Sequence, residues 1–191
     1  MNVKHGNYSL DKLEVLNMKR ILLFCYLVLI LCQATAFAKE VIIPKEELCI
    51  GGINLDCTLG YVKEIYGEPK EVIRKEEGRS GTKMGRTCYI TYVYSDTFKV
   101  TGKKGEWELG GEDDARVVAV FIKDNSLSTP SGFTVGMPYA AVAEMFGKGW
   151  KRTHQGITWY GYASDMSGIR SINFHVDDAE TVTAITVYSQ H

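Results

Sequence analysis

Cysteine and histidine are scarce in this chain, and its basic residues do not cluster. The 191 residues include five cysteines and four histidines. His154 and His175 lack a serine or cysteine at the spacing of a nucleophile and its base. No basic tract or stripe is present, which argues against a nucleic-acid partner. We therefore predict no catalytic residue, no cofactor and a protein that is not an enzyme.

The few cysteines limit the possible crosslinks. Cys25 and Cys32 lie in an apolar N-terminal run, whereas Cys49, Cys57 and Cys88 lie further along. In an exported protein three cysteines allow at most one intramolecular disulfide and leave a free thiol. Cys88 opens a predicted strand that could return beside either of the others, so both Cys57–Cys88 and Cys49–Cys88 pairings stay open. No His–Cys pair has the spacing of zinc ligands, so no metal site is predicted.

The N-terminal region has the pattern of a secretory signal peptide, at residues 18–38. Lys19 and Arg20 precede an apolar run over residues 21–32, and Ala36-Phe37-Ala38 supplies the small residues of a cleavage site after Ala38. A membrane anchor is the alternative, but the run is shorter than the roughly 20 residues that a spanning helix needs. We expect an exported protein, periplasmic or secreted, with no stable membrane span after cleavage.

Two further features of this region bear on processing. A lipid on Cys32 is disfavoured because the preceding Leu31 is bulky. Residues 1–17 do not fit a signal peptide, and the Glu14-Val15 codons can contain a ribosome-binding sequence. We therefore interpret Met18 as the initiator and residues 1–17 as leader, with a disordered extension as the alternative. Removal of residues 1–38 takes away four of the 22 basic and two of the 23 acidic side chains, which leaves a net charge of −3.

One sequence pattern occurs twice. Residues 53–67 are echoed by residues 133–147, and strands rich in tyrosine follow both copies. Such internal self-similarity indicates a repeat architecture. The apolar positions of each copy recur at helical spacing, and Gly67 and Gly147 are suited to end the helices. We expect four of these positions to face a sheet: Val62, Ile65, Val142 and Met145.

The predicted fold class is α+β, with two tandem repeats, each a short helical segment packed on an antiparallel sheet of about four strands. The first repeat covers residues 39–123, a linker covers residues 124–131, and the second repeat covers residues 132–191. Strands are predicted at residues 72–74, 88–94, 98–100, 117–122, 150–154, 158–163, 169–176 and 182–187.

The helix pattern Gly/Asp-x-Thr-x-x-x-Val-x-x-Ile-x-Gly, at residues 56–67 and 136–147, resembles the β-lactamase inhibitory protein family and the SmpA/OmlA-type outer-membrane assembly lipoproteins. The resemblance covers nearly all of residues 48–188. It implies the same tandem-repeat fold and a protein partner held by a sheet face. The motifs are more specific for fold than for activity, because function depends on the sites that a fold carries.

The chain departs from the inhibitor family in two respects. Those inhibitors insert a long aromatic hairpin with an aspartate into the enzyme, whereas here only the short Ser95-Asp96-Thr97 turn stands at that place. The resemblance therefore makes Asp96 a candidate partner-binding residue. The paired disulfides of the family are also missing, because the second repeat has no cysteine.

Strand alternation separates two groups of aromatic residues. The repeated tyrosines suit the packed side of the sheet: Tyr92, Tyr94, Tyr160 and Tyr162. Tyr89 and Trp159 then point to the other side, together with Trp107 if its strand joins them. Aromatic residues on an open sheet face are common anchors of protein interfaces.

These residues predict an exported, non-enzymatic module that binds a protein through one sheet face, in an inhibitor-like manner. A structural role in envelope assembly is the first alternative, and a secreted enzyme with an unrecognised site is the second.

Overall fold

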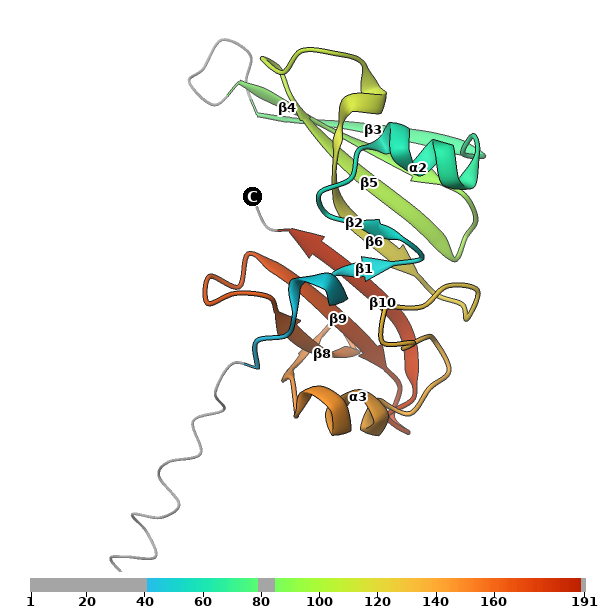
Figure 1. The fold of residues 1–191 in the computed structure, drawn as a ribbon, viewed down its shortest axis with the longest axis vertical. Helices are drawn as coiled ribbons and strands as arrows, with labels where there is room; N and C mark the ends of the chain where they lie inside the picture. The colour runs from blue at the N-terminus through green and yellow to red at the C-terminus, as the bar shows by residue number, and fades with distance from the viewer. Residues whose placement is uncertain (1–40, 79–84, 190–191) are drawn as a thin grey trace, which may run out of the picture. The chain divides into compact units, whose positions relative to one another are not determined.

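The computed structural model describes residues 41–78 and 85–189 (Figure 1). The predicted leader and signal peptide lie outside the described residues. No helix of the described part is both long and apolar enough to cross a membrane. The helical elements are α2 (Leu59–Tyr66), α3 (Tyr139–Phe146) and two 3₁₀ turns, η1 (Lys45–Glu47) and η2 (Glu112–Asp114).

Ten strands are present in the described residues, eight of them in one large antiparallel sheet. Its order is β3-β4-β5-β6-β10-β9-β8-β7, and β1 and β2 form a separate two-stranded sheet. The strands are β1 (Cys49–Ile50), β2 (Ile53–Asn54), β3 (Glu71–Gly78), β4 (Arg86–Val93), β5 (Phe98–Gly105), β6 (Arg116–Ile122), β7 (Trp150–His154), β8 (Ile157–Ala163), β9 (Arg170–Val176) and β10 (Val182–Ser189).

The predicted fold class, two helix-on-sheet repeats, is wrong. The structure contains a single eight-stranded sheet with only two α-helices in the described part of the chain. β6 and β10 pair antiparallel, with Ile185 opposite Ile122 and Tyr188 opposite Ala119. Each would otherwise present an edge of unpaired N–H and C=O groups, and pairing removes both edges. Similarity within the sequence does not reveal this pairing, because it joins residues far apart in the chain.

Two short helices rest on the sheet. Thr58 caps α2, because its Oγ1 accepts a hydrogen bond from the Tyr61 N–H at 3.3 Å. Leu59 and Val62 of α2 are fully buried, and Leu59 sits over Gly102 of β5, where a side chain would collide with it. α2 ends at Gly67, whose φ of 77° favours glycine.

Only part of the predicted helix–sheet contact is confirmed. Val62 and Val142 are buried, but Ile65 is 44% exposed and Met145 is 57% exposed. At 100° per residue, positions 59, 62 and 66 form one stripe, and position 65 lies well to its side. An eight-residue helix therefore docks along a narrow line, and the prediction for Ile65 and Met145 is wrong.

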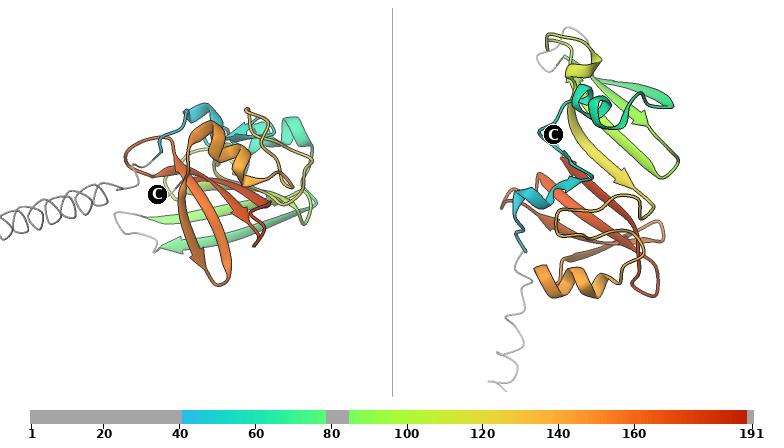
Figure 2. Two further views of the ribbon diagram at one scale, coloured as in Figure 1. Left: turned by 90° about the horizontal axis from the view of Figure 1, so that it is seen from below. Right: turned by 45° about the vertical axis from the view of Figure 1, so that its right-hand side comes forward.

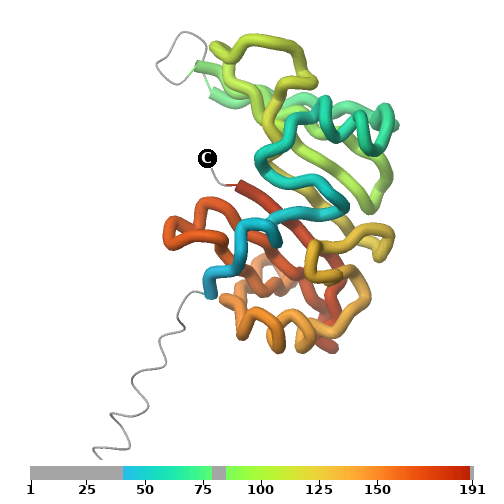
Figure 3. The backbone as a smooth tube through the Cα atoms, in the orientation of Figure 1, coloured from blue at the N-terminus to red at the C-terminus, as the bar shows by residue number. Residues whose placement is uncertain are grey.

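The main cluster of the hydrophobic core lies on one side of the large sheet, whereas the smaller buried residues Val93, Ala163 and Ala184 belong to the other side. The main cluster includes Tyr92 from β4, Val100 from β5, and Tyr160 and Tyr162 from β8. The buried tyrosines occupy the side that alternation predicts. Both helices pack on this side, which we call the packed face (Figure 2). Residues 41–55 cross the same face between the two helices, and Ile43 N–H donates to the Ala163 carbonyl at 2.9 Å (Figure 3).

We call the opposite side of the sheet the open face. The strand registers assign its side chains, which are Glu71, Ile73, Lys75 and Glu77 on β3; Thr87, Tyr89, Thr91 and Val93 on β4; Lys99, Thr101, Lys103 and Gly105 on β5; Arg116, Ala119 and Phe121 on β6; Ala184, Thr186 and Tyr188 on β10; Ser171, Asn173 and His175 on β9; Ile157, Trp159, Gly161 and Ala163 on β8; and Trp150, Arg152 and His154 on β7.

Candidate functional site

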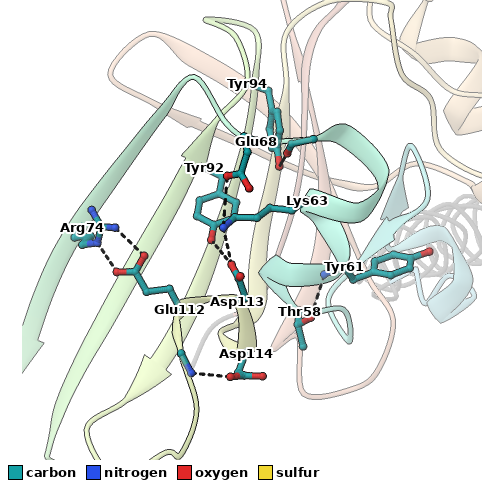
Figure 4. Close-up of polar contacts among 12 residues, drawn as sticks. Thr58, Tyr61, Lys63, Glu68, Arg74, Tyr92, Tyr94, Glu112, Asp113 and Asp114 are labelled. Atoms are coloured by element: carbon teal, nitrogen blue, oxygen red, sulfur yellow. Dashed lines mark hydrogen bonds and ion pairs between the residues drawn. The ribbon is translucent and has the colours of Figure 1, made fainter.

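Two regions bring charged or aromatic side chains together and are therefore candidate sites: a polar cluster at the edge of the packed face, and the open face. In the polar cluster, Lys63 Nζ lies 2.8 Å from Asp113 Oδ1 (Figure 4). The Tyr92 hydroxyl donates to the same carboxylate oxygen at 2.9 Å. Lys63 also lies over the Tyr92 ring, 5.2 Å from its centroid. Helix α2, strand β4 and turn η2 thus contribute one residue each.

A second cluster of the same composition lies in the other half of the sheet. The Tyr160 hydroxyl donates to Glu180 Oε1 at 2.5 Å, and Lys151 lies 5.3 Å from the centre of the Tyr160 ring. Lys151 Nζ is 3.8 Å from the same Glu180 oxygen. In each of the two clusters, the hydroxyl of a buried tyrosine therefore lies beside one acidic residue and one lysine.

Burial and hydrogen bonding shift the pKa values of the residues in both clusters. Burial raises the pKa of Tyr92, and the hydrogen bond to Asp113 adds to the rise. Burial likewise raises the pKa of Tyr160, with a further rise from Glu180. The hydrogen bond from Lys63 lowers the pKa of Asp113. A tyrosine that acts as a base needs a lowered pKa, whereas these buried phenols stay protonated and donate to carboxylates at the protein surface.

The open face is the second candidate, and Trp159 on β8 lies within it. The Trp159 ring is 5.9 Å from the ring of His175 on β9. His175 Nε2 is 3.2 Å from Thr186 Oγ1 on β10. Burial lowers the pKa of His175, so the imidazole is neutral near pH 7. The imidazole thus links β8, β9 and β10 through its contacts with Trp159 and Thr186.

Trp150 adds a second tryptophan to this face. It is the cross-strand partner of Gly161, and a side chain at Gly161 would come within 2.3 Å of the Trp150 ring. The ring therefore occupies the space that a side chain at Gly161 would need. On β9 of the same face, Ser171 Oγ and Asn173 Oδ1 are buried without a hydrogen-bond partner in the described residues.

The structure does not gather the predicted partner-binding residues into one patch. Tyr89 on β4 and Trp159 on β8 share the open face, but four strands separate them in the sheet. Trp107 is 69% exposed in the loop after β5, outside the strands. Asp96 is exposed in the β4–β5 turn. Of the predicted residues, only Tyr89 and Trp159 therefore belong to the sheet surface.

The predicted disulfide pairings are not formed. Cys49, Cys57 and Cys88 are all free. Cys88 lies on β4 opposite Glu76 and Lys104, whereas Cys49 lies on β1 opposite Asn54. The Cys57 thiol donates to Asn54 Oδ1 at 3.4 Å, so Cys57 neighbours Cys49 across this asparagine. Burial raises the pKa of both Cys49 and Cys88. No group of three or more possible metal ligands occurs among residues 41–78 and 85–189.

Sequence reasoning missed Trp150 and the charged residues of the open face. A tryptophan that pairs with a strand glycine is a recognised compensation for the missing side chain, but identifying the pair requires the register. The lysines Lys99 and Lys103 alternate with buried Phe98 and Val100, and this local pattern could have placed them on the face of Tyr89.

Comparisons with known proteins add little about function. No protein-family model and no protein with curated annotation matches the chain. An extracellular protein with an SCP domain from Bacillus anthracis matches with a TM-score of 0.42 and 14% identity, over 80% of this chain and 49% of that one. The chain thus spans about half the length of that protein.

Two other solved structures are similar to the same degree. A DUF4309-family protein from Bacillus subtilis has a TM-score of 0.40 and 12% identity, over 70% of this chain and 78% of that one. The uncharacterized protein yfeY from Escherichia coli has a TM-score of 0.42 and 10% identity, over 76% of this chain and 99% of that one. Similarities this low carry no argument about activity or partners.

Proposed function

We propose that this chain is an exported, non-enzymatic module that holds a protein partner against the open face of its eight-stranded sheet. The observation that carries the proposal is the one-sided core. Every residue of the core cluster and both helices lie on the packed face, whereas Tyr89, Phe121 and Trp159 remain half-buried on the other side. Aromatic residues on an uncovered surface are typical of interaction sites.

Binding is favoured over catalysis by the state of the titratable groups. The tyrosines in the polar clusters have raised pKa values, and His175 is neutral and bonded to Thr186. The raised tyrosine pKa values do not supply a base, and no carboxylate of the described residues orients the His175 ring, as the base of an activated hydroxyl–histidine pair requires. Export is part of the proposal because of the charged, apolar and small-residue segments at residues 18–38.

Truncation of Trp159 tests the proposal. The exported protein, wild type or Trp159→Ala, is immobilised and exposed to the medium and envelope fraction of the producing cells. We expect the variant to bind the captured partner more weakly by about 2 kcal/mol, or roughly 30-fold in Kd, because buried tryptophans dominate interfaces.

Trp107→Ala is the matched control, because it removes the same side chain from a loop outside the sheet. It should leave the partner's Kd within about twofold. Circular dichroism and the urea midpoint establish that both variants are folded. Equal capture by the wild type and a folded Trp159→Ala would refute the proposed binding face.

A further inference from the structure

The basic side chains on the two faces of the sheet differ in their ion pairing. On the packed face, basic side chains form ion pairs with acids from neighbouring elements. On the open face, four basic side chains have no ion pair with any residue of the described ranges. The packed-face pairs are Lys63–Asp113, Arg74–Glu112, Arg86–Glu76, Lys151–Glu180 and Arg170–Asp56. The unpaired cations of the open face are Lys99, Lys103, Arg116 and Arg152.

Aromatic side chains lie near these cations. Lys103 lies between Tyr89 on β4 and Arg116 on β6 in the strand register. At other levels of the sheet, Lys99 lies opposite Phe121, and Arg152 lies opposite Trp159. Directly opposite side chains have Cβ atoms about 5 Å apart. Each cation therefore has an aromatic ring beside it or one position away.

Acidic side chains are nearly absent from the same surface. From β4 to β7 the strand positions of the open face include no Asp or Glu; its two acids, Glu71 and Glu77, lie on the edge strand β3. Glu77 pairs with Lys75 at 2.7 Å. Glu108 from a loop and Asp114 from η2 line a hollow of about 350 Å³ with Lys103 and Arg116. Asp114 is held by the Gly111 N–H at 2.7 Å.

We propose that the partner presents an acidic protein segment, with Asp or Glu interspersed among apolar residues, that lies across the open face. This inference rests on the proposed binding function and names the chemistry of its partner. Unpaired cations attract carboxylates, and charge complementarity selects partners and speeds their association. Arg116 and Arg152 can each hold a carboxylate through two parallel hydrogen bonds.

The size of the segment follows from the sheet. Lys103 on β5 and Arg152 on β7 are five strand spacings apart in the order of the sheet. At about 4.8 Å per spacing this is roughly 24 Å across the strands, and the registers offset the two residues by roughly 20 Å along them, so about nine extended residues cover the diagonal. An acidic protein segment suits the site better than an anionic lipid surface, because Lys99 and Lys103 are half-buried and a flat bilayer reaches only protruding side chains.

The experiment uses three fluorescein-labelled ten-residue peptides in which tyrosine alternates with glutamate, glutamine or lysine. Fluorescence anisotropy gives the Kd of each for the wild-type protein at low and at physiological salt. We expect the glutamate peptide to bind at least tenfold more tightly than the other two. Its affinity should fall as salt rises, because exposed charges are screened.

Two quadruple variants distinguish the effect of the open-face cations from the effect of the protein's total charge. Lys99→Gln/Lys103→Gln/Arg116→Gln/Arg152→Gln should lose at least tenfold in affinity for the glutamate peptide. Lys45→Gln/Lys70→Gln/Lys123→Gln/Lys148→Gln removes the same charge from exposed positions outside the open face, and should keep the Kd within about twofold. Equal losses in both variants, or equal binding of the glutamate and glutamine peptides, would overturn the proposal.

The same variants distinguish failure of this inference from failure of the proposed function. If the open-face variant still captures a partner that Trp159→Ala loses, the face binds a protein but that protein is not acidic. If neither variant changes capture, the binding face itself is refuted. Charge-dependent binding to phosphatidylglycerol vesicles without binding to the glutamate peptide would also overturn the inference, because the ligand would then be a lipid surface.

Discussion

His175 lies on the proposed binding face and also limits the stability of the fold at acid pH. It lies half-buried between Trp159 and Thr186, and burial lowers its pKa from the ordinary 6.5. The unfolded chain therefore takes up this proton more readily than the folded chain. Stability is unaffected by His175 above about pH 6.5 and falls as the pH drops through that value.

We predict that the free energy of unfolding of the wild type falls between pH 7 and pH 5, and that His175→Gln removes part of this fall. Urea unfolding at several pH values measures it. Asp113 and Asp165 do not contribute in this window, because both have pKa values lowered from 3.8 and stay ionised. His154→Gln is the control, since His154 is exposed. An unchanged pH slope in His175→Gln would contradict the burial argument.

At the level of elements, the two short helices gain their stability from docking. Isolated helices of eight residues are not stable in water, so α2 depends on the few side chains that reach the sheet. Leu59 and Val62 are fully buried, whereas Ile65 is 44% exposed. The helical period predicted that the apolar residues of this segment share one side. Leu59, Val62 and Ile65 cannot all face the sheet, however, because so short a helix docks along a narrow line.

Val62→Ala and Ile65→Ala form a matched pair that measures this docking. We predict that Val62→Ala lowers the free energy of unfolding by about 2–3 kcal/mol, because it loses transfer energy and leaves a cavity. Ile65→Ala should cost less than about 1 kcal/mol, because the side chain is already partly in water. Chemical denaturation of the two variants measures both losses in the free energy of unfolding. Equal losses would mean that α2 presents a different side to the sheet.

For the whole molecule, the sequence predicted local structure better than assembly. Alternation placed Tyr92, Tyr160 and Tyr162 on the packed side, because the period of a strand is a property of neighbouring residues. The β6–β10 pairing was missed, because it joins residues 119–122 to residues 185–188 and leaves no local pattern. The cation-rich open face was missed for the same reason, since its residues come together only through the registers of several strands.

The β6–β10 pairing also determines how the molecule should unfold. Val120, Ile122, Ile185 and Val187 are fully buried at this junction and belong to one core cluster with residues of both halves. A core shared in this way predicts one cooperative transition in place of two. Truncation of a core residue in the first half should then destabilise the second half equally.

Leu59→Ala tests this coupling in a Trp107→Phe background, where the remaining tryptophans are Trp150 and Trp159, on β7 and β8 in the other half of the sheet. We predict that Leu59→Ala lowers the free energy of unfolding by about 2–4 kcal/mol. The loss should be the same whether tryptophan fluorescence or circular dichroism follows the transition. A fluorescence midpoint that does not move with Leu59→Ala would show that the halves unfold independently and that the β6–β10 pairing does not unite them energetically.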